Sequence, residues 1–168
     1  MRVVRSSVAL AGAALVAAVA SAEVWSHSEP YAPEQPIAFS HRIHAIDDGI
    51  DCAYCHGAVR RSTFAGIPSV ERCMGCHRIA LREHPEVEKL ARYWNYGATV
   101  PWVKVYALPG FVRFDHRAHE RAQVTCATCH GYVETMDVVA RVSSLKMGWC
   151  VDCHASADAP IDCVTCHF

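Results

Sequence analysis

Only a few stretches of the chain have a hydrophobic and polar pattern that predicts regular structure. Residues 84–94 (HPEVEKLARYW) predict a helix, because Pro85 stands in the first turn and His84 precedes it as a cap. Residues 100–114 (VPWVKVYALPGFVRF) alternate apolar and polar side chains around a Leu-Pro-Gly turn at 108–110, which predicts a small β-hairpin. Residues 23–38 carry three prolines and show neither a helical period nor two-fold alternation, so an extended lead-in is expected there.

The first residues have the pattern of an export signal. Arg2 and Arg5 precede an apolar run from residue 8 to residue 20, and Ala20-Ser21-Ala22 has the small residues of a cleavage site. We therefore expect residues 1–22 to be a signal peptide and residues 23–168 to be the mature, periplasmic domain. The alternative is an uncleaved N-terminal membrane anchor over residues 6–25, although its alanine-rich composition makes insertion weak.

Charge and composition narrow the class of protein. The 168 residues contain 16 Lys and Arg against 17 Asp and Glu, a net charge of -1, so a large basic face for nucleic acid is not expected. The chain also has 10 Cys and 11 His, which by count alone could indicate a disulfide framework or zinc sites.

All ten cysteines fall in five copies of C-x-x-C-H, the attachment pattern of c-type haem. Two thiols three positions apart can bond to the two vinyl groups of one haem, and the following His then ligates the iron. Zinc, disulfides and a thioredoxin-like relay do not require a His after every second Cys. The sequence therefore predicts five covalently bound haem c groups. Their attachment residues and proximal ligands are Cys52, Cys55 and His56; Cys73, Cys76 and His77; Cys126, Cys129 and His130; Cys150, Cys153 and His154; and Cys163, Cys166 and His167.

The motifs are organised as an internal duplication. The phrase F-x-H-R-x-H at 39–44 and again at 114–119 precedes a C-x-x-C-H-G, and a further C-x-x-C-H follows each time. This divides the haem domain into a first half (39–77), a linker helix and hairpin (78–113), a second half (114–154) and a fifth haem segment (155–168). The expected fold is mainly irregular, with short α-helices and the small hairpin, and porphyrin faces replace much of the side-chain core.

Histidines outside these motifs are candidates for the distal iron ligands. His41 and His44 are three residues apart on one helical face, so they should reach two different haems, and the same holds for His116 and His119. Surface histidines are the alternative interpretation. The fifth distal ligand stays open among His27, His84, Met136 and Met147; a Met ligand would raise the potential of its haem.

Beyond these motifs, the chain resembles the pentahaem cytochrome subunit of alternative complex III, a bacterial quinol:electron-acceptor oxidoreductase, and is related in its histidine pairs to class III multihaem cytochromes. The matching phrases are PEQPIAFSHRIHAIDDGIDCAYCHG, FAGIP followed by CMGCH, PWVKVYALPGFVRFDHRAH and LKMGWCVDCH. The resemblance implies mostly bis-His haems in a closely spaced wire that docks to a periplasmic iron–sulfur partner, with His41, His44, His116 and His119 as ligands.

Electron transfer without substrate chemistry is the function that these observations favour. We expect a subunit of a quinol-oxidising respiratory complex, with iron–sulfur or other cytochrome subunits and quinol-binding membrane subunits as partners, and no catalytic residue of its own. The alternatives are a stand-alone soluble electron shuttle, a multihaem reductase of a small oxyanion or nitrogen compound, and haem-based sensing. A reductase would need an iron with an open position.

Overall fold

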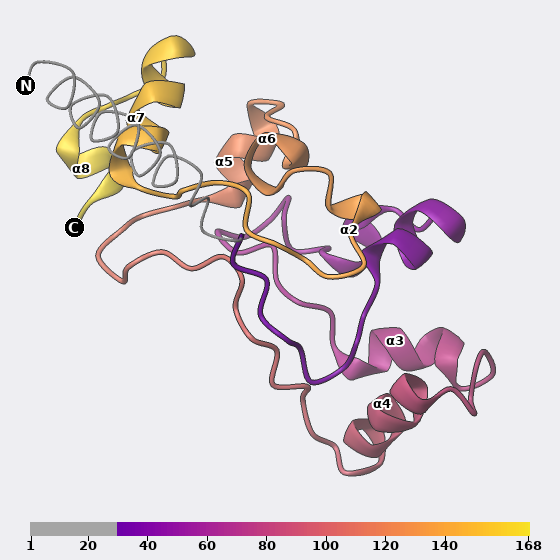
Figure 1. Cartoon of the computed structure of the whole chain (residues 1–168). Helices are drawn as coiled ribbons and strands as arrows, with labels where there is room; N and C mark the ends of the chain where they lie inside the picture. Colours follow the sequence, from indigo (N-terminus) through magenta and orange to yellow (C-terminus); the bar gives the residue numbers. More distant parts are fainter. Residues whose placement is uncertain (1–29) are drawn as a thin grey trace, which may run out of the picture. The chain divides into compact units, whose positions relative to one another are not determined.

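The computed structural model describes residues 30–168, and residues 31–168 form one unit. The proposed signal peptide or anchor and His27 lie outside the described residues. Short helices joined by irregular segments make up the described part (Figure 1). They are η1 (Arg42–Asp47, a π-helical turn), α2 (Cys52–Cys55), α3 (Val70–His77), α4 (Pro85–Asn95), α5 (His116–Arg121), α6 (Cys126–His130), η2 (Val133–Thr135, a 3-10 turn), α7 (Met147–Ser156) and α8 (Cys163–Cys166).

Helix α4 confirms the prediction for residues 84–94. His84 is its N-cap, with its Nδ1 accepting a hydrogen bond from the Glu86 amide at 3.3 Å, and Pro85 occupies the first turn. One face of the helix buries Val87 and Leu90. The sequence forms a helix here because local capping and an apolar face act together.

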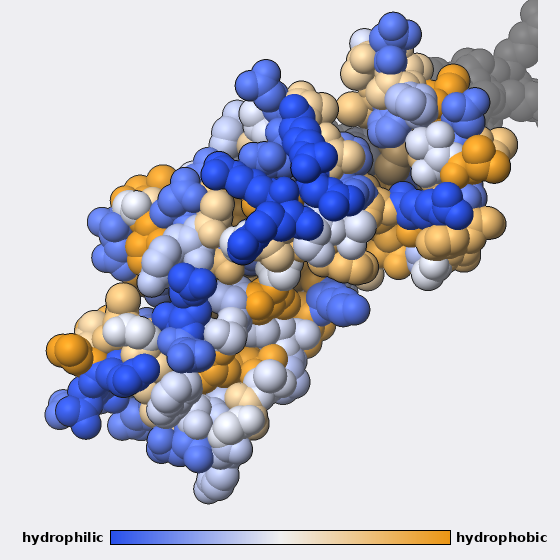
Figure 2. All heavy atoms as spheres, turned by 180° about the vertical axis from the view of Figure 1, so that it is seen from behind, coloured by the Kyte–Doolittle hydropathy of each residue, from blue (hydrophilic) through white to orange (hydrophobic). Residues whose placement is uncertain are grey.

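The side-chain core lies where α4 packs against α3. Its buried members are Ile37, Met74, Leu90 and Val100. No large side chain in residues 30–168 is fully buried, and apolar side chains reach the surface in separate places among strongly polar ones (Figure 2). Side-chain packing therefore forms only a small core, as expected for a fold whose apolar interior is completed by large cofactors.

The hairpin predicted over residues 100–114 is wrong. Within residues 30–168 the structure has no strand, only an isolated antiparallel bridge between Val112 and His167. The turn is present, closed by a hydrogen bond from the Val112 amide to the Pro109 carbonyl at 3.0 Å. The segment before it does not fold back on itself, because the side-chain amide of Gln35 donates to the Val103 carbonyl at 3.0 Å and accepts from the Val103 amide at 2.9 Å.

None of the helices in residues 30–168 is long and apolar enough to cross a membrane. The described part of the chain is thus mostly irregular with short helices, as the sequence predicts, and each C-x-x-C pair lies on one of those helices.

Candidate haem-binding site

The ten cysteines are all free thiols, and each C-x-x-C pair lies on a helical turn. A helical turn brings positions i and i+3 to the same face, so both sulfurs of a pair can bond to one flat group. Asp51 supports the first pair by capping α2, since its carboxylate accepts a hydrogen bond from the Ala53 amide at 2.7 Å. Partial burial raises the pKa of five of the thiols above the usual value, which keeps them protonated at neutral pH: Cys52, Cys55, Cys73, Cys129 and Cys150.

Three motif histidines face a histidine of an F-x-H-R-x-H phrase. The ring centroids are 6.1 Å apart for His44 and His77, 6.3 Å for His116 and His130, and 6.0 Å for His119 and His154. A bond from a metal to an imidazole nitrogen is about 2.0 Å long, and the ring centroid lies roughly 1.1 Å further out, so two imidazoles on opposite sides of one metal have centroids about 6.2 Å apart. The spacing of all three pairs therefore fits one iron between the rings.

His41 has His56 as a close neighbour. The pKa of His41 is lowered to about 4, first by burial and then by the nearby His56 and His44. The pKa of His130 is also lowered, first by burial and then by His116 and His56. Among the described residues, His41 Nδ1 is the buried side-chain nitrogen that has no hydrogen-bond partner. Every expected ligand from the F-x-H-R-x-H phrases thus lies near a motif histidine.

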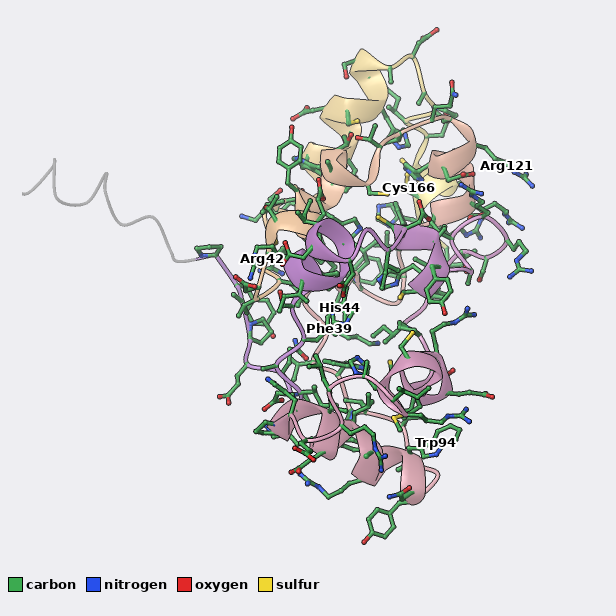
Figure 3. All side chains as sticks on the ribbon, turned by 90° about the vertical axis from the view of Figure 1, so that its right-hand side faces the viewer. Phe39, Arg42, His44, Trp94, Arg121 and Cys166 are labelled. Atoms are coloured by element: carbon green, nitrogen blue, oxygen red, sulfur yellow. The ribbon has the colours of Figure 1, made fainter. Side chains whose placement is uncertain are left out.

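Phenylalanine fixes both histidines of each phrase. Phe39 meets the edge of His41 at 4.9 Å and 88°. It also stacks on His44, at 4.3 Å and 27° (Figure 3). Phe114 repeats this arrangement, at 4.7 Å and 89° to His116 and at 4.7 Å and 29° to His119. One aromatic ring therefore orients two imidazoles in the same way at both places.

Backbone carbonyls set the tautomer of six of these imidazoles. A carbonyl can only accept, so each contact with Nδ1 places the proton there and leaves the lone pair of Nε2 free for a metal. The contacts are His44 to Ser40 and His119 to Asp115, both at 2.8 Å; His56 to Gly66 at 2.6 Å; His77 to Ala80 at 3.2 Å; His116 to Thr63 at 2.9 Å; and His154 to Pro160 at 2.7 Å. These contacts are the ones expected of neutral imidazoles that can bind a metal through Nε2.

The first segment (39–77) and the second segment (114–154) bind each other through the loops that follow their first C-x-x-C-H motifs. The amide of Arg42 donates to the Met136 carbonyl at 3.1 Å, and the amide of His116 donates to the Thr63 carbonyl at 3.1 Å. An ion pair accompanies each contact: Arg42 to Asp137 at 3.3 Å and Arg60 to Glu120 at 3.1 Å.

The fifth motif differs from the three motifs whose histidines face a second imidazole. The ring next to His167 is Phe111, with centroids 5.9 Å apart and planes 30° apart, and the described residues place no histidine ring against it. Three of the four open candidates for a distal ligand lie among the described residues, and each has its own place in the structure. His84 caps α4 through Nδ1, Met136 packs beside Gly131, Met147 is 63% exposed at the start of α7, and His27 is outside the described residues.

Sequence reasoning missed three aromatic residues. Phe39 and Phe114 could have been found, because they recur at the same place in the repeated phrase. Tyr106 could not. Its ring meets His130 edge-on at 4.4 Å, while its hydroxyl donates to the Ala140 carbonyl at 3.2 Å and accepts from the Val142 amide at 3.2 Å. Gly131 helps this packing, since a side chain there would meet Val142 at 3.1 Å and its φ is 69°.

Comparison with known proteins agrees with a haem-binding chain. No protein-family model matches the sequence. The chain is 38% identical over 102 residues to the multihaem cytochrome c subunit of menaquinone reductase from Nitratidesulfovibrio vulgaris (strain Hildenborough), an alignment that covers 60% of this chain and 48% of the relative. The aligned region spans about half the length of that relative. Five C-x-x-C-H motifs and this similarity are together consistent with five c-type haems in a multihaem cytochrome.

Proposed function

We propose that the chain is a pentahaem c-type cytochrome that transfers electrons along a row of haems. Each bound haem would supply one iron that takes up and releases a single electron. The observation that carries the proposal is the spacing of the imidazole pairs, 6.0 to 6.3 Å between ring centroids, beside helical C-x-x-C turns. Two imidazoles on one iron leave no position for a substrate, so these sites are suited to electron transfer.

The chain's own residues would hold four of the irons from both sides. The geometry supports His77 with His44, His130 with His116, and His154 with His119 as proximal and distal ligands. His56 with His41 completes the set, supported by the effect of His56 on the pKa of His41 and by the matching place of His116 in the second segment. In each phrase the two histidines would then serve two different haems, as the spacing of three residues predicts.

Duplication of a two-haem unit would explain why the two segments correspond. Phe39 with His41 and His44 has nearly the same ring geometry as Phe114 with His116 and His119. His44 and His119 also bond the carbonyl four residues earlier at the same distance, 2.8 Å. We therefore interpret residues 39–77 and 114–154 as two copies of one unit, with residues 78–113 between them and the fifth haem segment at 155–168.

The order of the attachment sites in space would differ from their order in the sequence. Burial is the largest cause of the raised pKa of four thiols, and a nearby cysteine of another motif is a further cause in each case. These cysteines are Cys55 for Cys73, Cys126 for Cys52, Cys153 for Cys129 and Cys166 for Cys150. The pairs order the motifs in space as second, first, third, fourth and fifth. Helices α3, α2, α6, α7 and α8 follow one another in the same order (Figure 1). Electrons would pass along that row, with the haem of the second motif at one end.

The partners follow from the resemblance and from the name of the relative, a menaquinone reductase subunit. We propose that the chain works outside the cytoplasmic membrane, in a quinol-oxidising respiratory complex similar to alternative complex III. It would exchange electrons with iron–sulfur or other cytochrome subunits, and quinol-binding membrane subunits would supply them. The chain itself would carry out no substrate chemistry.

Purification of the tagged chain from membranes of its native host tests this proposal. The expected preparation contains five haems per chain, and its haems become reduced when a menaquinol analogue is added. A quinol-site inhibitor should stop this reduction, while dithionite should still reduce every haem. A chain that purifies alone and is reduced only by small soluble donors would contradict the complex and leave the soluble shuttle. A ferric EPR spectrum dominated by high-spin iron would contradict electron transfer itself.

A further inference from the structure

One loop of the first segment contacts a ligand imidazole of two different haems. The loop is residues 58–66, which follow the first C-x-x-C-H motif. The Gly66 carbonyl accepts a hydrogen bond from Nδ1 of His56 at 2.6 Å. The Thr63 carbonyl accepts from Nδ1 of His116 at 2.9 Å and from the His116 amide at 3.1 Å. His56 is the proposed proximal ligand of the first haem, and His116 is the proposed distal ligand of the third haem.

Internal contacts make this loop a single short unit. Two amides within it donate to the Ala58 carbonyl, each at 2.9 Å. Arg60 anchors the loop to α5 through its ion pair with Glu120 at 3.1 Å. Gly66 has a φ of 77°, a backbone conformation that glycine adopts readily and other residues rarely do. The two carbonyls that bind the imidazoles therefore belong to one turn, so a displacement of the turn moves both.

A hydrogen bond at Nδ1 changes how strongly an imidazole binds iron. When Nδ1 donates to a carbonyl, the ring becomes a more basic ligand. A more basic ligand stabilises ferric iron over ferrous iron, which lowers the potential of the haem. Weakening either carbonyl contact of the loop should therefore raise the potential of the haem concerned.

The corresponding loop of the second segment makes a different contact. There the Met136 carbonyl accepts from the amide of Arg42, which is one residue after His41. The buried Nδ1 of His41 has no hydrogen-bond partner among the described residues. Contact with an imidazole of the other segment is thus a property of residues 58–66 and was not kept, or not gained, in the second copy.

We propose that Thr63 and Gly66 are positioning residues through which one loop sets the potentials of the first and third haems together. The inference rests on the proposed function, because it requires haems ligated by His56 and His116. The two haems are neighbours in the proposed row, and a displacement of the loop loosens both imidazole contacts at once. A common shift leaves the difference in potential between the two haems nearly unchanged, and with it the driving force for electron transfer from one to the other.

Gly66→Ala tests this proposal in the purified pentahaem protein. An added methyl group would meet nothing closer than the Ala58 methyl at 3.8 Å, so the substitution acts through the strained φ and not through a clash. The redox components that His41→Met and His116→Met displace identify the first and third haems. In Gly66→Ala both components should move to higher potential, with the other three in place, and the low-spin ferric EPR signals of the same two haems should change.

Gly97→Ala is the matched control. Gly97 follows α4 with a φ of 63°, and a methyl group there would meet no atom within 4 Å, so the backbone strain is of the same kind. None of the described imidazoles bonds to Gly97, so its substitution should lower the stability of the fold and displace no haem component. A shift of only one component in Gly66→Ala, no shift at all, or the same shifts in Gly97→Ala would overturn the proposal.

A pair of surface variants decides the matter even if Gly66→Ala does not assemble. Arg60→Ala releases the loop from Glu120 without changing the loop backbone. Arg61→Ala removes the same charge one residue later, from a side chain that bonds the Gly57 carbonyl at 3.4 Å and not α5. Compared with Arg61→Ala, Arg60→Ala should raise the potentials of the first and third haems together. Equal potentials in the two variants would overturn the proposal, whereas a wild-type preparation with fewer than five haems per chain would contradict the proposed function instead.

Discussion

The imidazole of His116 lies nearly parallel to that of His130, with their planes 9° apart and their centroids 6.3 Å apart. His116 belongs to α5 and His130 ends α6, so two separate short helices bring the rings together. Thr63, from the other segment, holds the Nδ1 of His116 at 2.9 Å and leaves Nε2 free. This pair is the clearest candidate for two ligands of one iron, and it allows a direct test.

Replacing His116 with Met should raise the potential of one haem and leave the other four nearly unchanged. A thioether favours ferrous iron more than an imidazole does, so Met/His ligation raises the potential. A spectroelectrochemical titration should then show one component displaced upward. His41→Met should displace a different component. A titration curve identical to that of the wild type would mean that His116 is not a ligand.

Replacing His84 with Ala distinguishes a role of this residue as the cap of α4 from a role as an iron ligand. The side chain of His84 accepts from the Glu86 amide at the start of α4, and loss of such a cap costs about 1 kcal/mol. We expect a lower free energy of unfolding in urea and no change in the haem spectra or potentials. His84→Asn, which can still cap, should restore the stability. A new high-spin haem in His84→Ala would show that the imidazole is a ligand.

Removal of the Tyr106 hydroxyl should destabilise the fold around the third motif. The hydroxyl donates to the Ala140 carbonyl and accepts from the Val142 amide, each at 3.2 Å, and the loss of such partly buried bonds costs about 1 to 2 kcal/mol. Tyr106→Phe keeps the ring beside His130, so the haem spectra should not change while urea unfolding occurs at lower concentration. Tyr96→Phe, at a residue that is 84% exposed, is the matched control and should behave as wild type.

Asp137 should make the contact between the two segments sensitive to acid. Hydrogen bonds from Ser40 and then from Arg42 hold the pKa of Asp137 below its usual value of 3.8. Folding therefore favours the ionised carboxylate, and this stabilisation is present above about pH 4 and lost as the pH falls through the lowered pKa. Its size is small because the pair is exposed to solvent.

Asp137→Asn should lower stability slightly at neutral pH and have less effect at pH values below the lowered pKa of Asp137, where the wild-type carboxylate is protonated as well. Thermal unfolding at a series of pH values measures this difference. Asp48→Asn is the control, since Asp48 forms no ion pair among the described residues. An equal difference between Asp137→Asn and the wild type at every pH would contradict the ionic contribution.

Structural features that depend on residues close together in the chain could be predicted from the sequence, and features that depend on distant residues could not. Helix α4 was predictable because His84 and Pro85 determine where it begins. His41 with His44, and His116 with His119, were predictable as pairs because a spacing of three residues defines one helical face. The haem motifs were explicit for the same reason, since each is contained in five consecutive residues.

Residues 100–114 show what an alternating pattern leaves undetermined. Alternation predicts an extended backbone but does not specify the group that it hydrogen-bonds. Here Gln35 bonds Val103, and the C-terminal residues bond the backbone around Val112, so no hairpin forms. The position of Phe111 beside His167 and that of Tyr106 beside His130 depend on contacts between residues 24 or more apart in the chain, which no local pattern contains.

The exchange of hydrogen bonds between Arg42 and Met136, and between His116 and Thr63, has a consequence for biogenesis. The turn that carries His41 and His44 rests on a carbonyl that lies 94 residues further along the chain than Arg42, at position 136. In a chain exported from its N-terminus, the ligand scaffold proposed for the first two haems would therefore stay incomplete until residue 136 has crossed the membrane. The first two C-x-x-C-H motifs would stay open to the haem-attachment machinery for that interval, and the two segments would complete their fold together.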